Sequence, residues 1–302
     1  MTLISMLIAL IIERLAVRSE AWQFLFYAKK YLSLSHSSAL SKLSDDSKGQ
    51  YLWVLLPGIL YALLLWLIGS SLVTLVLNTL VLLVCIGCWH YRQLYKQYLN
   101  ASERADNEAA FLTMQQLSND VGLTDAELSY GQRLVWLNFR YYAAVLFWFA
   151  LLGGAGAITY ALLRQMNEPV SWDKPMKLAN EGDETAEFVE ATPDIPAVFQ
   201  QLMFWADWVP ARLFGVGLAL VGHFSRASAS LLAFLGDFTT PTDKVVTTVA
   251  KAAEPLPDDA YNCAEETSCM VQLAKRNVLF FLALVAVLTP VSYTHLTLPT
   301  KA

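Results

Sequence analysis

Three long stretches of the chain contain no charged residue, and they occupy positions 52–69, 72–89 and 141–163. A helix rises about 1.5 Å per residue, so about 18 apolar residues are enough to cross the roughly 30 Å hydrocarbon core of a bilayer. Inside hydrocarbon, a helix satisfies every backbone N–H and C=O within its own segment. A very short link around Ser70 joins the first two stretches and predicts a hairpin of antiparallel helices over residues 51–89. The pattern therefore predicts three transmembrane helices.

The apolar segments at the two ends are shorter. Residues 278–289 predict a last transmembrane helix that is truncated, because the sequence after it neither continues a span nor caps a helix. We therefore interpret residues 290–302 as a non-native tail. Residues 1–50 begin with about twelve apolar positions before Glu13, which are too few to span a membrane. They predict an amphipathic or interfacial helix that packs on the bundle, followed by a polar segment.

Two polar regions separate the apolar segments. Residues 90–140 carry tyrosine and leucine at helical spacing, which predicts a helical loop. Residues 164–277 form an acidic polar region that contains a semi-hydrophobic segment near 198–238. Charged residues interrupt this segment, so it predicts an interfacial or re-entrant helix that begins near Pro210. The fold class predicted is an all-α integral membrane protein with about four transmembrane helices, an N-terminal interfacial helix and this further interfacial or re-entrant helix.

Composition agrees with a membrane protein, and charge suggests its orientation. Of all residues 56% are hydrophobic and only 16% are charged, and the mean hydropathy is +0.42. Residues 164–276 hold 16 acidic and 9 basic side chains, whereas the rest of the chain holds 10 and 12. Because basic loops stay in the cytoplasm, residues 1–50 and 90–140 are predicted to be cytoplasmic and residues 164–277 external. A basic surface for nucleic acid is not indicated, so no nucleic-acid partner is predicted.

The usual sequence motifs of catalysis, metal binding and nucleotide binding are not present in this sequence. No cofactor and no metal site are therefore predicted. Cys85 and Cys88 lie within an apolar stretch, where cysteine behaves as a small hydrophobic residue. Cys263 and Cys269 lie in a polar stretch and would form a disulfide if it faced an oxidising compartment, the alternative being two unpaired thiols.

Small and polar residues inside the apolar stretches suggest helix packing. Gly153 and Ala157 form a small-xxx-small pair that lets two helices approach closely. Asn78 lies in the middle of a predicted span, where an unpaired amide would cost several kcal/mol. We therefore expect Asn78 to bind a neighbouring helix, with a transport site as the alternative.

Charged and polar side chains next to the apolar segments are the candidate ligand-binding residues. They form three groups that we expect to meet at the membrane surface: Glu13 with Arg14, Asn138 with Arg140, and Asp207 with Arg212. Of these six, all but Arg14 are the predicted ligand-binding residues. Arginine holds phosphate or carboxylate groups by paired hydrogen bonds, and the two carboxylates would balance or orient the arginines. The alternative interpretation is that these residues only anchor helix ends at the interface. No catalytic residue is indicated.

Several of these segments resemble the AmpE family. The resemblance is carried by the block LVWLNFRYYAAVLFWFALLGGAGAITYALLR over residues 134–164 and by DWVPARLFGVGLALVGHF over residues 207–224. It implies a multi-pass protein of the bacterial inner membrane that regulates β-lactamase induction and the response to cell-wall stress or antibiotics. The lipid bilayer is then one partner, and the pathway of the AmpD amidase or cell-wall fragments would be others.

A more distant similarity leads to the alternative function. The CobD/CbiB family of cobalamin synthesis, membrane enzymes that form an amide bond with ATP, shares a W-I-P-A-R-L-like block, here Trp208–Leu213. Those enzymes carry an N-T-L-D-S-M-like motif after the third span, where this chain has Leu163–Glu168 instead. The resemblance implies a shared scaffold, with ATP-dependent amide ligation as the alternative to regulation.

Overall fold

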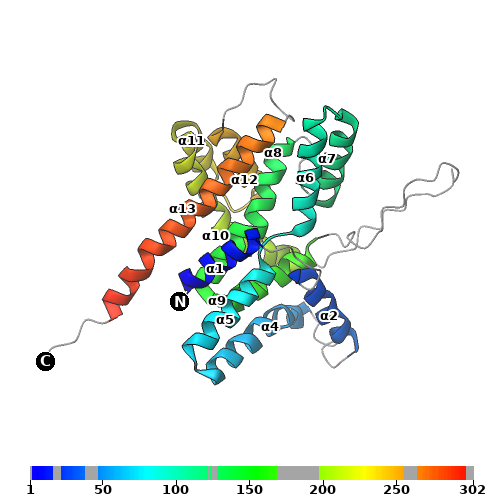
Figure 1. Ribbon diagram of the computed structural model, residues 1–302. Helices are drawn as coiled ribbons and strands as arrows, with labels where there is room; N and C mark the ends of the chain where they lie inside the picture. Colours follow the sequence, from blue (N-terminus) through cyan, green and yellow to red (C-terminus); the bar gives the residue numbers. More distant parts are fainter. Residues whose placement is uncertain are drawn as a thin grey trace.

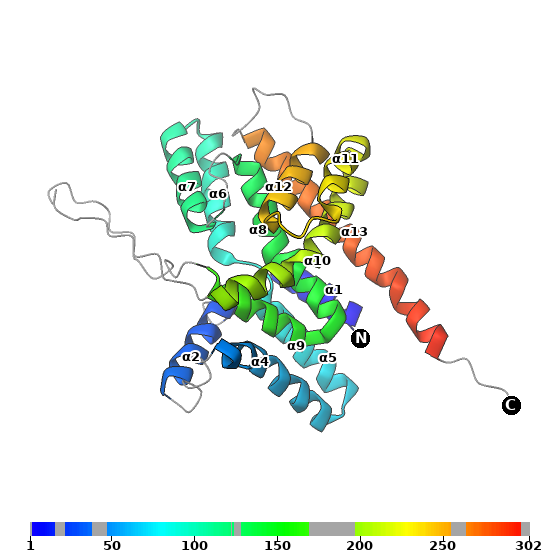
Figure 2. The same cartoon turned by 180° about the vertical axis from the view of Figure 1, so that it is seen from behind.

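The computed structural model describes residues 2–15, 22–37, 47–121, 123, 128–168, 197–254 and 264–296, and these residues form helices and no strand (Figures 1 and 2). The helices in chain order are α1 (Thr2–Leu15), α2 (Phe24–Ser37), α4 (Ser47–Ile68), α5 (Ser71–Cys85), α6 (Trp89–Glu103), α7 (Asn107–Val121), α8 (Tyr130–Asn138), the π-helix η2 (Phe139–Ala143), α9 (Ala144–Met166), α10 (Ala197–Val221), α11 (Phe224–Leu235), α12 (Thr242–Ala253) and α13 (Ala264–Leu296). The all-α fold class predicted from the sequence is confirmed.

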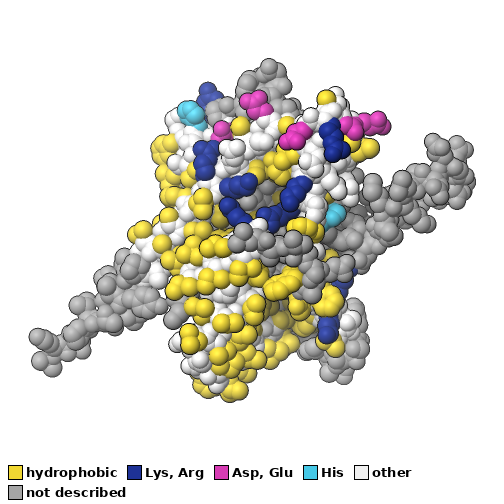
Figure 3. Space-filling view, in the orientation of Figure 1, with side chains coloured by type: hydrophobic (Ala, Val, Ile, Leu, Met, Phe, Trp, Pro, Cys, Tyr) yellow, Lys and Arg dark blue, Asp and Glu magenta, His cyan; other side chains and the backbone are white. Residues whose placement is uncertain are grey.

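Four helical segments are long and apolar enough to cross a membrane. They are Gly49–Ile68, Tyr130–Met166, Ala197–Val221 and Ala264–Thr289, counted by length and composition alone, and the second of them is sharply bent at Gly153. Figure 1 places α4, α5 and α9 in one half of the molecule and α6, α7, α8, α11 and α12 in the other. Hydrophobic side chains cover most of the first half, and most of the charged side chains in view lie on the second half (Figure 3). The chain is therefore an integral membrane protein with an apolar half and a polar half.

The hairpin predicted over residues 51–89 forms, but its second helix is shorter than expected. The turn uses Gly69, which has φ +63°, a backbone conformation that favours glycine. The helix α5 ends at Cys85, and the chain resumes as α6 at an angle of 51°. Gly87 permits this break with φ +75°, and its N–H donates to the Tyr141 carbonyl at 3.1 Å. The apolar stretch over 72–89 is therefore broken by a bend, and its last residue, Trp89, already belongs to α6.

The third apolar stretch reverses direction at Gly153, which has φ +63° and ψ −151°. Arg164 therefore donates to the carbonyl of Arg140, at an N···O distance of 3.1 Å, although 24 residues separate them. The turn divides the stretch into two helical limbs, one before Gly153 and one after it. The second limb, from residue 154 to Met166, is about 20 Å long, which is too short to cross the membrane. The prediction of a single span over 141–163 is wrong, because two glycines allow a sharp turn that hydrophobicity alone does not reveal.

The two glycines of this turn have different roles. A Cβ at Gly153 would meet no atom within 4 Å, so Gly153 provides the turn and not the helix packing predicted for it. A Cβ at Gly154 would lie 2.5 Å from the Tyr61 ring and 2.7 Å from the Asn78 amide oxygen. Asn78 accepts hydrogen bonds from the Gly154 N–H at 3.2 Å and from the Tyr61 hydroxyl at 2.9 Å. The prediction that Asn78 binds neighbouring helices is confirmed.

The semi-hydrophobic segment forms two helices: the second, α11, begins at Phe224 after a break at His223, and the first, α10, is continuous with Pro210 inside it. The sequence predicted that it would start near Pro210 and be too short to span, whereas it begins at Ala197 and is 25 residues long. The charged residues do not interrupt it, because Asp207 and Arg212 are 2% and 5% exposed and hold hydrogen bonds to neighbouring helices or loops.

The last helix is also longer than predicted. It begins at Ala264 and continues to Leu296, whereas the sequence predicted a helix over 278–289. Cys263 lies outside the described residues, so its pairing with Cys269 stays a prediction, as does the non-native character of residues 290–302.

The described polar helices from both polar regions lie on one side of the molecule. The helix α8, from the region predicted to be cytoplasmic, packs against α12 and α13, from the region predicted to be external. Figures 1 and 2 show α6, α7, α8, α11, α12 and the start of α13 at the same end. The opposite placement of 90–140 and 164–277 is therefore wrong, because the reversal at Gly153 returns the chain to the side from which it came.

Candidate functional site

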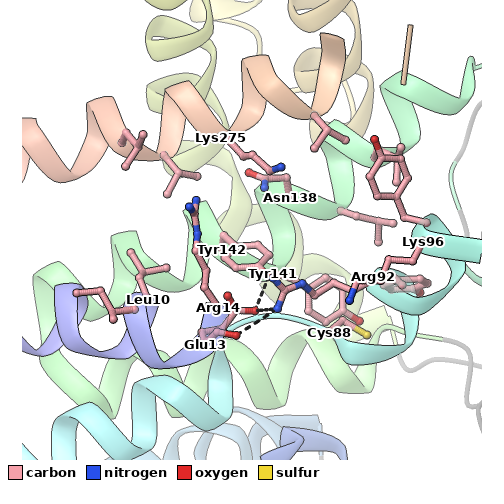
Figure 4. Close-up of a pocket in the computed structure, with 18 of the residues that line it drawn as sticks. Leu10, Glu13, Arg14, Cys88, Arg92, Lys96, Asn138, Tyr141, Tyr142 and Lys275 are labelled. Atoms are coloured by element: carbon pink, nitrogen blue, oxygen red, sulfur yellow. Dashed lines mark hydrogen bonds and ion pairs between the residues drawn. The ribbon is translucent and has the colours of Figure 1, made fainter. Parts of the chain in front are cut away.

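A cavity of about 560 Å³ lies where the polar and apolar halves meet (Figure 4). Helices α1, α6, α8, η2 and α13 contribute its lining, which is mostly apolar and tyrosine-rich. Its charged residues are Glu13, Arg14, Arg92, Lys96 and Lys275. Four basic side chains therefore face one carboxylate, and the cavity is positively charged.

Glu13 is held firmly at the edge of the cavity. Its side chain is 3% exposed, and its Oε1 accepts from Arg92 at 2.5 Å and from the Tyr142 hydroxyl at 2.9 Å. The break between α5 and α6 makes room for this carboxylate, because a Cβ at Gly87 would lie 3.0 Å from the same Oε1. One basic residue therefore neutralises Glu13, and three further cations remain around the cavity.

These three cations come from three different helices. Arg14 ends α1, Lys96 lies in the middle of α6, and Lys275 lies in the first half of α13. No described carboxylate forms an ion pair with any of the three. Lys275 instead interacts unfavourably with the positive charges of Arg14 and Arg92. Such a cluster of like charges favours a bound anion.

Asn138 adds a polar group to the same cavity. It is the last residue of α8, where η2 widens the helix by one residue per turn. The amide oxygen of Asn138 is buried, and it has no hydrogen-bond partner among the described residues. In Figure 4 the side chains of Asn138 and Lys275 lie next to each other in this view, below α13. Asn138 therefore places a buried acceptor without a described partner next to the cavity.

A second cluster lies inside the protein and is electrically balanced. Tyr160 donates to Asp207 at 2.7 Å, and Arg164 lies 3.9 Å from Glu168. Arg140 interacts with both carboxylates electrostatically, and all the charged members are at most 8% exposed. Buried charges persist when they are paired in this way. The cluster fastens α10 to the two limbs of the third apolar stretch.

Arg212 lies at a third place. Its guanidinium donates to the carbonyl of Asp237 at 2.6 Å and lies over the ring of Trp208, with 4.4 Å from the carbon to the ring centroid. The Asp237 carboxylate accepts from the hydroxyls of Thr240 and Thr239. These hydrogen bonds hold the pKa of Asp237 well below its usual value. Arg212 therefore attaches the turn after α11 to α10.

Comparison with known proteins identifies the family. The family profile described as "Regulatory signalling modulator protein AmpE" matches residues 1–296. The chain belongs to the AmpE family. A curated relative, Protein AmpE of Shigella flexneri, is 31% identical over 310 residues, which cover 96% of this chain and 98% of that protein. No solved structure matches the chain.

The structure divides the five candidate residues of this AmpE-family chain among three places. Glu13 and Asn138 line the cavity, Arg140 and Asp207 belong to the buried cluster, and Arg212 holds the turn after α11. The expectation that all three groups meet in one surface site is wrong, because α10 buries its two charged residues against other elements. Whether any of the five binds a ligand stays a prediction.

Sequence reasoning singled out Glu13 and Arg14 but did not assign Arg92, Lys96 or Lys275 to a ligand site. Arg92 and Lys96 are spaced by four residues on α6 and therefore share a face, which is a signal that could have been used. Arg14 and Lys275 each adjoin an apolar segment, as expected for interfacial anchors. Nothing in the sequence links Arg92 to Glu13, which lies 79 residues away.

Proposed function

We propose that this protein is a multi-pass regulator in the bacterial inner membrane that modulates β-lactamase induction in response to cell-wall stress or antibiotics. The observation that carries the proposal is the match to a family of regulatory signalling modulators over residues 1–296. Its four apolar helical segments suit a membrane location. The inner membrane in particular follows from the regulatory role, which requires communication with the cytoplasm.

The cavity gives this regulator a place to receive a signal. It lies between α1, α6 and α13, so a ligand that fills it contacts three helices from distant parts of the chain and can alter how they pack against one another. A ligand shifts a protein between two arrangements when it binds one of them more tightly. Of the predicted site residues, Glu13 and Asn138 line the cavity and would contact such a ligand directly. The downstream partners proposed are the AmpD amidase pathway or cell-wall fragments.

The alternative of an ATP-dependent amide ligase is not proposed. The profile match assigns almost the whole chain to regulatory proteins. The polar motif that follows the third apolar stretch in the CobD/CbiB enzymes is replaced here by Leu163–Glu168. In the structure, Arg164 and Glu168 from this segment are buried in the balanced cluster.

A complementation experiment tests the proposed regulation. In a host strain that lacks its own copy, the gene is restored under its native promoter, and β-lactamase activity is measured before and after a sublethal dose of a β-lactam. We expect the induction ratio to differ at least severalfold between the strain with the gene and the strain without it. Equal ratios in the two strains, with the protein present in the membrane fraction, would contradict the proposal.

A further inference from the structure

The cavity has a polar end and an apolar end, and the order of residues on two helices produces this division. Along α1, the apolar residues Leu7 and Ile11 precede Arg14, and along α13 Lys275 precedes Leu279. All five line the cavity. The two helices therefore place their basic residues toward α6 and their leucine and isoleucine side chains away from it.

The apolar end is open to the hydrocarbon. Leu7, Ile11 and Leu279 are 43%, 57% and 57% exposed, although each also lines the cavity. Figure 3 shows basic side chains near the middle of this face, next to the apolar half of the surface. A molecule can therefore reach the basic end by lying between α1 and α13 with its apolar part in the bilayer.

The basic end has the charge of an anion site. Glu13 is neutralised by Arg92 and the Tyr142 hydroxyl, which leaves Arg14 and Lys275 beside each other with no described carboxylate between them. Lys96 adds a third cation from α6. Bringing like charges together costs energy, and a bound group with one or two negative charges relieves this repulsion.

The buried amide oxygen of Asn138 is an independent indication of a ligand at this end. Asn138 lines the cavity, and this oxygen is buried beside it without a hydrogen-bond partner among the described residues. A buried acceptor left without a partner destabilises the protein, so a donor is expected there when the site is filled. A hydroxyl of a phosphate headgroup provides that donor next to the charged oxygens.

We propose that this cavity binds the phosphate headgroup of an anionic lipid, whose hydrocarbon chains leave between α1 and α13. The inference rests on the proposed function, because it names the class of ligand that the regulatory cavity receives. Arg14, Lys96 and Lys275 hold the phosphate oxygens, and Asn138 accepts a hydrogen bond from the headgroup. Leu7, Ile11 and Leu279 contact the chains.

Lipid binding to the full-length protein in detergent tests the inference, and native mass spectrometry or a radiolabelled ligand provides the readout. The ligands compared are phosphatidic acid, phosphatidylglycerol, the zwitterionic phosphatidylcholine, and glycerol phosphate, which has the headgroup without chains. We expect the two anionic lipids to bind at least about tenfold more tightly than phosphatidylcholine and glycerol phosphate, a difference of about 1.4 kcal/mol. Equal binding of phosphatidylcholine would overturn the anion requirement, and equal binding of glycerol phosphate would overturn the lipid.

Variants locate the binding in the cavity. The double variant Arg14→Gln/Lys275→Gln is expected to lose about tenfold in affinity for phosphatidic acid. The single variant Lys96→Gln is expected to lose less than this. Arg276→Gln is the matched control, because Arg276 adjoins Lys275 in sequence but is 52% exposed and pairs with Glu254. Unchanged affinity in a correctly folded double variant, or an equal loss in the control, would overturn the proposal.

The two proposals fail in different ways. Binding is measured on purified protein and needs no β-lactamase readout. A protein that binds anionic lipid but leaves induction unchanged would contradict the regulatory function alone. A protein that alters induction and shows no lipid preference would contradict the lipid inference alone.

Discussion

At the scale of single residues, the cavity shows one paired charge next to several unpaired ones. Glu13 is nearly fully buried and is held by Arg92 and Tyr142, whereas Arg14 extends toward Lys275 (Figure 4). The carboxylate therefore fixes the junction of α1, α6 and η2, and the remaining cations are available for a ligand. Positive charge is retained around the cavity because the pair between Glu13 and Arg92 is complete.

Glu13→Gln should destabilise the protein by about 1–2 kcal/mol. Breaking a fully buried ion pair costs about 3–5 kcal/mol, and the lower figure reflects that Arg92 is 37% exposed and partly screened by solvent. The measurement is the unfolding midpoint in detergent micelles. Glu254→Gln is the matched control, because its pair with Arg276 is 3.5 Å long and exposed, and it should change stability by less than about 0.5 kcal/mol. Equal effects would show that Glu13 does not hold the junction.

The sequence identified Glu13 and Asn138 as site residues because each adjoins an apolar segment, and the structure places both at the cavity. It did not identify Arg92 as the partner of Glu13, since contacts between residues far apart in the chain leave no mark in a single sequence. It placed Arg140 and Asp207 at the membrane surface, but their opposite charges compensate each other inside the protein. A charged residue therefore does not by itself indicate a surface site, because an oppositely charged residue on another helix can allow it to be buried.

At the scale of elements, apolar length predicted where helices form but not where they turn. The stretch over residues 141–163 has the composition of a transmembrane helix, because none of its residues is charged. The reversal depends on the backbone conformation of Gly153, with φ +63° and ψ −151°, a region that is almost restricted to glycine. Two adjacent glycines signal such a turn only weakly, because small residues also serve helix packing.

Gly153→Ala should destabilise the protein by about 1–3 kcal/mol, because a Cβ at this backbone conformation is strained. The control is Gly236→Ala, at a position with φ −104°. A Cβ meets no atom within 4 Å at either position, so the two variants differ in backbone strain and not in crowding. The unfolding midpoint of each variant in detergent provides the comparison, and a Gly153→Ala variant as stable as Gly236→Ala would show that the chain does not reverse at this residue.

At the scale of the whole molecule, the reversal changes the orientation of everything that follows it. Counting 141–163 as one span placed residues 164–277 outside the cell, on the opposite side from residues 90–140. With the reversal, α11, α12 and the start of α13 join α6, α7 and α8 at one end (Figures 1 and 2). The cavity then lies at the boundary between a single polar half and the apolar half.

Cysteine labelling of the protein in cells tests this arrangement most directly. Single cysteines replace Ser70 in the hairpin turn, Glu103 in α6 and Lys251 in α12, all exposed or at an exposed turn, in a background without the native cysteines. A membrane-impermeant maleimide is applied to intact spheroplasts and to inverted vesicles. The account predicts that Glu103→Cys and Lys251→Cys react from the cytoplasmic side and Ser70→Cys from the opposite side. Reaction of Lys251→Cys from the same side as Ser70→Cys would contradict it.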